Sequence, residues 1–153
     1  MGGAYAAFYR IETEIKTIYL SNIHLDTPRI AFKYLLSNDL NYDWVESIEN
    51  NRTIEAALVS SWAKSKKNTI IAGDFNMAAD ENVYREYFSS FTNVLNESGV
   101  GFNYTKYTPI HGVRIDHILV SDNFKILDSK VLESVGGDHL PVMTTLAIAP
   151  KIF

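Results

Sequence analysis

The chain has 153 residues, of which 46% are hydrophobic and 21% charged, and its net charge is −4. This composition excludes a disordered or fibrous protein, and the acidic balance argues against binding of polyanions by bulk electrostatics alone. The absence of cysteine excludes disulfides, thiolate metal sites and cysteine nucleophiles. No apolar run reaches the roughly 18 residues of a membrane span and no signal peptide is present, so we expect a soluble single domain over residues 1–153, with its localisation open.

The N-terminal part of the chain predicts a β-hairpin followed by a long helix. Two apolar segments, residues 8–11 and 17–25, flank a polar stretch and are typical of paired strands. Apolar residues then recur at helical spacing over residues 43–65, with Asn41 or Asp43 as the candidate N-cap. The apolar face of this helix comprises Val45, Ile48, Ala56, Val59 and Ala63, with Arg52 among them.

The middle of the chain predicts a strand, a short helix and an irregular segment. The apolar strand, residues 69–72, ends abruptly at a glycine and an aspartate. We expect the short helix over residues 82–88, capped by Asp80. Residues 98–111 are rich in Gly, Thr, Tyr and Asn, which is typical of an irregular surface segment.

Three strands close the chain, at residues 112–120, 124–132 and 142–148. The first alternates strictly, which puts Asp116 on one face of the strand and His117 on the other. Strands that mostly meander, with helices between some of them, predict an α/β (α+β) fold in which a sheet is layered with helices.

The first motif with possible chemistry is Gly-Asp-Phe-Asn at residues 73–76, directly after an apolar strand. Glycine allows a sharp turn, and Asp74 and Asn76 can face one pocket from positions two residues apart. The carboxylate could act as a base or position water, and the carboxamide could donate to a developing oxyanion. An Asx turn that simply leaves the strand explains the same residue types.

A second motif, Gly-Gly-Asp-His-Leu-Pro at residues 136–141, precedes the last strand. Asp138 can supply a metal ligand, and His139 an imidazole that approaches a phosphate. The alternative is a loop in which the aspartate caps locally and the histidine is solvated.

Two further residues lie in or at the end of strands. Asp116 is costly to bury inside a hydrophobic strand unless it is paired, either with Arg114 on the same face or with a histidine that needs orientation. A surface Arg–Asp pair of little energetic value is the other reading. His24 ends a strand, where a lone histidine is usually structural, and His111 and His117 are assigned no role.

In combination and in this order, the four motifs closely resemble the C-terminal half of the endonuclease/exonuclease/phosphatase (deoxyribonuclease I-like) superfamily. The likeness runs from about Tyr19 to Leu146, and residues 24–29 and 101–105 resemble a bacterial branch of that superfamily. The motifs are Asn-x-His-Leu at 22–25, Gly-Asp-Phe-Asn at 73–76, Arg-Ile-Asp-His-Ile at 114–118 and Asp-His-Leu-Pro-Val at 138–142.

The resemblance implies half or most of a two-layer β-sandwich flanked by helices, with an active site where strand-end loops converge. It also implies hydrolysis of phosphodiesters or phosphomonoesters by water, with Mg²⁺ or Mn²⁺ as the cofactor. By this resemblance Asp74 would position or deprotonate the water. Asn76 would hold the surroundings of Asp74 and donate to a non-bridging phosphate oxygen.

The remaining roles also follow from the resemblance alone. His139 would bind the phosphate and stabilise the transition state, and Asp116 would hold His139 in the required tautomer. Asp138 would contribute to the metal site, directly or through water. His24 would contact the phosphate or assist the leaving oxygen.

The first half of the superfamily pattern is missing, because neither its Asn nor its Gln-Glu pair occurs upstream of His24. We therefore expect the C-terminal portion of a domain whose exposed apolar sheet face is covered by the missing N-terminal half or by a homo-oligomer. The alternative is a non-catalytic module that binds phosphate or mediates association. A Ser-His-Asp hydrolase is remote, since no serine lies in a Gly-x-Ser-x-Gly elbow. Nucleic acid, phospholipid and small phosphoesters stay open as substrates.

Overall fold

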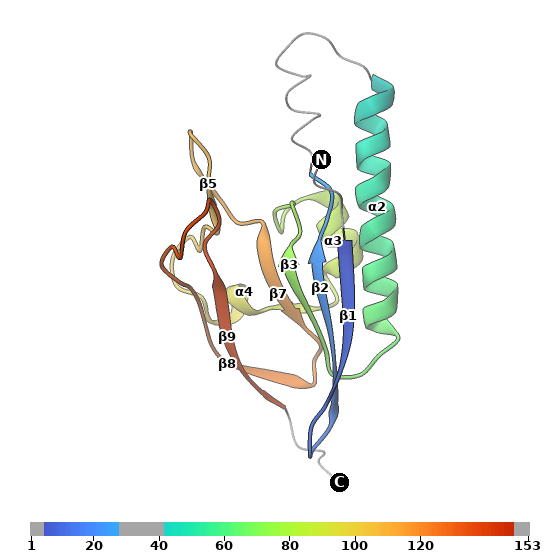
Figure 1. Ribbon diagram of the computed structural model, residues 1–153, viewed down its shortest axis with the longest axis vertical. Coiled ribbons are helices and arrows are strands. Elements are labelled where there is room, and N and C mark those ends of the chain that lie inside the picture. The colour runs from blue at the N-terminus through green and yellow to red at the C-terminus, as the bar shows by residue number, and fades with distance from the viewer. Residues whose placement is uncertain (1–4, 28–41, 149–153) are drawn as a thin grey trace.

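The computed structural model describes residues 5–27 and 42–148, apart from the side chains of residues 42–45 and 48. The candidate cap Asn41 and the side chains of Asp43, Val45 and Ile48 lie outside that description. The long helix begins at Tyr42, so Asp43 lies inside it and is not its N-cap residue. The main sheet has five strands in the order β1-β2-β3-β7-β4 (Figure 1). These strands are β1 (Tyr5–Glu12), β2 (Thr17–His24), β3 (Thr69–Asp74), β4 (Thr92–Asn93) and β7 (Asp116–Val120).

The expected hairpin forms, and both of its strands are long. β1 and β2 pair antiparallel from Glu12 opposite Thr17 to Tyr5 opposite His24. The Thr13 hydroxyl closes the turn, since its oxygen accepts from the Lys16 N–H at 3.0 Å and its proton is donated to the Lys16 carbonyl at 2.7 Å. The hairpin is thereby held in one register along its whole length.

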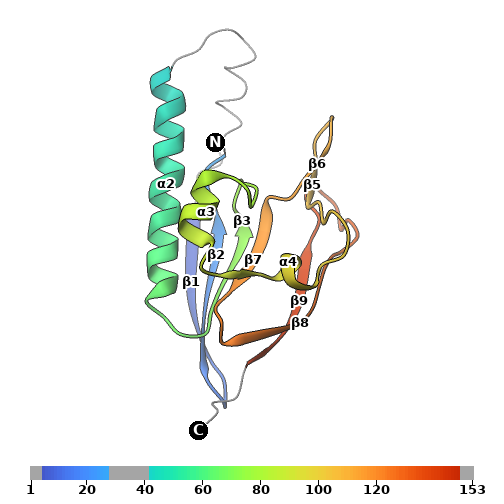
Figure 2. The ribbon, with the colours of Figure 1, turned by 180° about the vertical axis from the view of Figure 1, so that it is seen from behind.

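Helices cover one face of the main sheet. Helix α2 (Tyr42–Lys64) connects the parallel strands β2 and β3 and lies against the sheet together with α3 (Asn82–Phe88), as Figures 1 and 2 show. The expected apolar face of α2 is buried where its side chains are described. That face comprises Arg52, Ala56, Val59 and Ala63, and it packs against Ile23, Leu25, Ile71, Phe75, Phe88 and Leu119.

A second apolar cluster fills the opposite face. Strands β8 (Phe124–Val131) and β9 (Val142–Ile148) form an antiparallel pair there, and helix α4 (Val94–Ser98) lies beside them (Figure 1). The buried residues of this cluster are Val94, Leu95, Val120 and Phe124. The molecule is therefore a mixed sheet with helices on one side and a two-stranded sheet on the other, and the predicted fold class is confirmed.

The last third of the chain differs from the expectation in detail. The strand expected over 112–120 is two strands, β6 (Gly112–Val113) and β7, because β6 pairs with β5 (Lys106–Tyr107) before the chain joins the main sheet. The segment 98–111 is irregular except for Ser98, which ends α4, and for β5. The expected Asp80 cap of α3 is wrong: Glu81 is the N-cap residue, and its side chain makes no cap hydrogen bond.

The outer strand β1 carries exposed apolar side chains. Tyr5, Tyr9 and Ile11 are 55%, 48% and 41% exposed and share a sheet face with Ile18 and Leu20 of β2. In the part of the chain that the structure describes, no helix is long and apolar enough to cross a membrane.

Candidate active site

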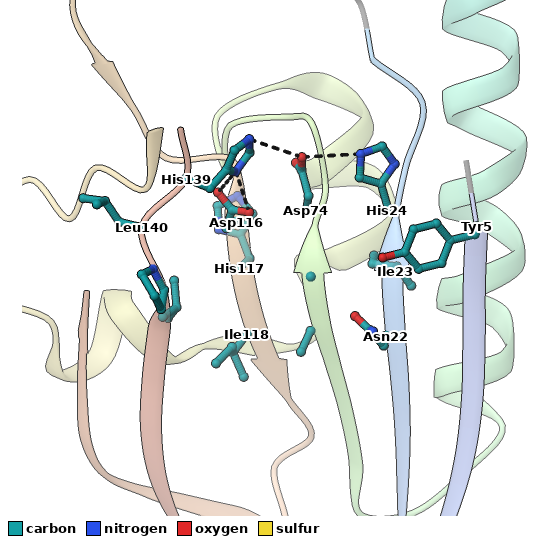
Figure 3. A pocket seen from close by; sticks show the side chains of 14 residues that line it. Tyr5, Asn22, Ile23, His24, Asp74, Asp116, His117, Ile118, His139 and Leu140 are labelled. Atoms are coloured by element: carbon teal, nitrogen blue, oxygen red, sulfur yellow. Dashed lines mark hydrogen bonds and ion pairs between the residues drawn. The ribbon is translucent and has the colours of Figure 1, made fainter. Parts of the chain in front are cut away.

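Strand pairing brings three of the sequence-predicted residues into one row. His24 is in register with Asp74 across β2 and β3, and Asp74 is in register with Asp116 across β3 and β7. Tyr5 extends the row through its pairing with His24. All four positions are first or last residues of their strands, so their side chains gather at one edge of the sheet (Figure 3).

The turn after β3 fixes the Asp74 carboxylate. A Cβ on Gly73 would lie 1.9 Å from the Ile23 carbonyl oxygen, and Gly73 has a φ of 141°, so this position requires glycine. The Asn76 N–H donates to Asp74 Oδ1 at 2.8 Å, and Asn76 itself has a φ of 48°. The Asx turn that was the alternative interpretation of this motif therefore forms, and it does so with Asp74 in the candidate site. It leaves Asp74 Oδ2 facing His24 Nε2 at 3.8 Å and His139 Nε2 at 3.9 Å.

Asp116 pairs with a histidine and not with Arg114. His139 Nδ1 lies 3.0 Å from Asp116 Oδ1 and 2.9 Å from Oδ2, while Arg114 donates to Asn96 Oδ1 at 2.7 Å. The reading of Asp116 as part of a surface Arg–Asp pair is therefore wrong, because the arginine side chain is engaged elsewhere. The His139 ring, 30% exposed, is held by this carboxylate and is not simply solvated.

Thr105 supports the strand end that carries Asp116. Thr105 is fully buried, and its hydroxyl oxygen accepts the N–H groups of Ile115 and Asp116, both at 3.1 Å. The Ile115 carbonyl in turn accepts from the Phe75 N–H at 2.9 Å. The loop after β3 and the start of β7 are thus tied to each other and to the segment before β5.

His24 lies on the other side of Asp74. Its ring stacks on the Tyr5 ring with centroids 5.6 Å apart and planes 3° apart, which orients Nε2 towards the carboxylate. The buried Nδ1 atom of His24 has no hydrogen-bond partner among the described residues. His24, Asp74, Asp116 and His139 all line one cavity of about 380 Å³ (Figure 3).

The donor set of this cavity suits a hard divalent cation. One ligand atom from each of Asp74, Asp116 and His139 lies within 4.8 Å of the others. Burial raises the pKa of Asp74, the Asn76 N–H opposes this, and the charge of Asp116 raises it further. Two carboxylates that repel each other in a half-buried site favour a bound cation or a proton between them. Carboxylate oxygens are the ligands that Mg²⁺ and Mn²⁺ prefer.

Asn76 and Asp138 lie outside this cavity. Asn76 Nδ2 donates to the Leu25 carbonyl at 2.8 Å, and the Asp138 carboxylate pairs with Lys106 Nζ at 2.6 Å. Both residues line a neighbouring cavity of about 490 Å³, together with Lys106. The structure therefore brings four of the six expected residues together and puts the other two beside them.

Besides Tyr5 and Thr105, two basic residues that the sequence did not assign to the site contact its motifs. Arg52 of α2 is buried and donates through Nη2 to the Asn76 carbonyl at 3.0 Å and to Glu81 Oε2 at 2.8 Å. Lys106 contacts Asp138 and, at 2.5 Å, His139 Nε2. The sequence could have drawn attention to Lys106, because it is the only Lys, Arg, Asp or Glu between residues 98 and 113.

An imidazole oriented by one carboxylate and facing a second one is typical of hydrolases that activate water. The chain matches the Endonuclease/Exonuclease/phosphatase family over residues 7–139 and belongs to that family. No curated protein sequence matches the chain significantly.

Solved structures show the same fold. A mannosyl-6-phosphatase from Bacteroides thetaiotaomicron is 23% identical, with a TM-score of 0.60 over 86% of this chain and 52% of that one. A 3′ phosphatase from Neisseria bound to a product DNA hairpin is 21% identical, with a TM-score of 0.58 over 85% and 61%. An endonuclease/exonuclease/phosphatase from Beutenbergia cavernae is 14% identical, with a TM-score of 0.72 over 97% and 45%. The chain thus spans about half the length of these structures.

Proposed function

We propose that the chain carries the water-activating and His–Asp part of a divalent-metal-dependent phosphoester hydrolase. The observation that carries the proposal is the convergence of Asp74 with the His139–Asp116 pair in one cavity. Family membership and neighbours named as phosphatases support a phosphoester substrate.

Asp74 acts on the attacking water in this proposal. Its raised pKa makes the carboxylate a better proton acceptor than an exposed aspartate. The Asx turn holds one oxygen of the carboxylate, so the other is directed into the cavity. Asn76 keeps the turn in place and, if its amide exchanges from the Leu25 carbonyl, donates to a non-bridging oxygen.

His139 and Asp116 act on the phosphate. Asp116 accepts the Nδ1 proton, which fixes the ring and leaves Nε2 on the side of Asp74. His139 then contacts the phosphoryl group, while His24, on the opposite side of Asp74, contacts the phosphate or assists the leaving oxygen.

A bound Mg²⁺ or Mn²⁺ would neutralise charge on the phosphate and polarise it towards attack. Asp74 and Asp116 would hold the ion through carboxylate oxygens. Asp138, whose side chain is 71% exposed, would contribute directly or through water.

The chain is proposed to be the C-terminal portion of its domain. Its span of about half the related structures and the exposed apolar side chains of β1 support this. The missing N-terminal half or a second copy of the chain would cover that face. Sedimentation of the chain, alone and with the N-terminal half of a relative, tests it. A stable, active and monodisperse monomer would contradict it.

Hydrolysis of bis-p-nitrophenyl phosphate by the chain with Mn²⁺ or Mg²⁺ tests the function. In whichever form shows metal-dependent turnover, the chain alone or the chain with an added N-terminal half, we expect Asp74→Asn and His139→Ala each to lower it by about 10² or more. His111→Ala is the matched control, because His111 is exposed and lies outside the cavity. Rates near wild type in the Asp74 or His139 variants would refute the assigned roles.

A non-catalytic phosphate-binding or association module is the second candidate. The placement of Asn76 and Asp138 favours it, because both residues lie outside the cavity that contains Asp74 and are engaged by the Leu25 carbonyl and by Lys106. A folded chain that binds phosphate but hydrolyses no ester, with or without an added N-terminal half, would support this candidate.

A further inference from the structure

Lys106 is a buried lysine whose amine lies at the border of the two cavities. Its side chain is only 9% exposed, although lysines usually keep the ammonium in water. Nζ lies 2.6 Å from Asp138 Oδ2 and 2.5 Å from His139 Nε2. Lys106 lines the cavity that contains Asn76, and His139 lines the cavity that contains Asp74.

The backbone holds Lys106 in this place. Lys106 pairs with Val113 in the β5–β6 hairpin and forms a bridge with His139 on its other side. The Leu140 N–H donates to the Thr105 carbonyl at 2.6 Å. The lysine is thus positioned by the same segment that supports Asp116, and its location does not depend on the flexible side chain alone.

Pairing with Asp138 does not explain why the ammonium is buried. The Asp138 side chain is 71% exposed, and an ion pair of that kind contributes little to stability. An ammonium directed outwards could make the same pair in water. The contact with His139 Nε2 is the one that requires the ammonium to point inwards.

The two contacts of His139 together fit a single tautomer. Nδ1 carries the proton donated to Asp116, and Nε2 offers its lone pair to the Lys106 ammonium. In this state Nε2 has no proton to give to a phosphate oxygen, so the contact of His139 with the phosphoryl group proposed above requires a proton on Nε2 and release of Nε2 by Lys106. The donor that an oxygen meets on approaching this ring nitrogen is therefore the lysine.

We propose that Lys106 is a phosphate-binding residue, whose ammonium donates to a non-bridging oxygen of the substrate next to His139. This inference rests on the proposed phosphoester substrate. The ammonium has three N–H donors, and among the described residues Asp138 and His139 accept from two of them. Lys106 then supplies a fixed positive charge in a site where Asp74, Asp116 and Asp138 are acidic. Because of this charge, the site would keep part of its affinity for a phosphate group when no metal ion is bound.

The test is the affinity of the 153-residue chain for inorganic phosphate in EDTA, measured by calorimetry. We expect Lys106→Met to weaken binding by about tenfold or more, since a charge-assisted hydrogen bond is lost. Lys106→Arg should stay within about threefold of the wild type, because it keeps charge and donors. Lys125→Met is the matched control, since Lys125 is exposed and lines neither cavity.

Unchanged affinity in Lys106→Met, or no phosphate binding by the folded wild type in EDTA, would overturn the proposal. Metal-dependent hydrolysis measured in parallel separates this failure from failure of the proposed function. If Lys106→Met does not fold, the ¹⁵N ammonium resonance of wild-type Lys106, assigned with Lys106→Arg, replaces it. A shift of that resonance on addition of phosphate supports the proposal, and an unmoved resonance overturns it.

Discussion

His117 makes the stability of the fold depend on pH in a predictable way. The ring is 1% exposed, with Nδ1 3.0 Å from Asn93 Nδ2 and Nε2 3.0 Å from the Met77 carbonyl oxygen. Burial lowers the pKa of His117 from 6.5 to about 4, the Met77 carbonyl opposes this, and the charge of Arg114 adds to it. The neutral ring therefore belongs to the folded state.

The direction follows from which state binds the proton. Below pH 6.5 the unfolded chain takes up a proton at His117 and the folded chain does not, so stability falls as the pH falls. The contribution is complete above pH 6.5 and is lost by about pH 4. Over the whole interval the free energy of unfolding decreases by about 3 kcal/mol from this group alone. Between pH 7 and pH 5 the decrease is about 2 kcal/mol.

Urea denaturation in EDTA at pH 7 and pH 5 measures this decrease. His117→Gln should be less stable than the wild type at pH 7, because the imidazole ring packs against the aromatic rings of Phe75 and Tyr84. The decrease in its free energy of unfolding between pH 7 and pH 5 should be smaller than that of the wild type by about 2 kcal/mol. His111→Gln is the control and should keep the wild-type dependence, since His111 is exposed. Equal pH dependence in wild type and His117→Gln would refute the reasoning.

Three further predictions concern the supports of the site, each measured by urea denaturation. Gly73→Ala should destabilise by about 3 kcal/mol or more, through the clash with Ile23 and the positive φ, whereas Gly101→Ala, which meets no atom within 4 Å, should cost only about 1 kcal/mol. Arg52→Met should cost about 2 kcal/mol or more, because Glu81 and the Asn76 carbonyl lose their donor. Thr105→Val should cost about 2 kcal/mol, because two buried N–H groups lose their acceptor, while Thr53→Val on the exposed side of α2 should cost under about 1 kcal/mol.

Local sequence patterns predicted most of the elements because each pattern has a local cause. The polar turn between two apolar segments predicted the β1–β2 hairpin, and the 3.6-residue spacing of Ala56, Val59 and Ala63 predicted the buried face of α2. The split of the strand expected over 112–120 could not be predicted in this way. It depends on pairing with β5 and on the Thr105 hydroxyl, which are contacts across the fold.

The candidate site was predictable where a titratable residue also lies at the end of a strand. Asp74 and His24 end parallel strands, so a shared edge of the sheet follows once the strands are identified. The partner of Asp116 was left open between Arg114 and a histidine, because alternation fixes only the face of a strand and not what a distant loop brings to it. Lys106 was missed for the same reason, since its role depends on the bridge with His139, 33 residues away.

Charge balance connects these features of the site. Asp74 and Asp116 lie in register on adjacent strands, where like charges repel, and burial of Asp74 strengthens the repulsion. Asp116 is compensated by the proton that His139 donates, and Asp138 by Lys106, so Asp74 is the carboxylate whose charge depends most on what enters the cavity. A water that gives up its proton to Asp74, a bound cation or a protonated His24 would each reduce the repulsion between the Asp74 and Asp116 carboxylates. Asp74, whose second carboxylate oxygen faces the cavity, is thus the acidic residue whose charge is compensated by the water, cation or substrate that binds there.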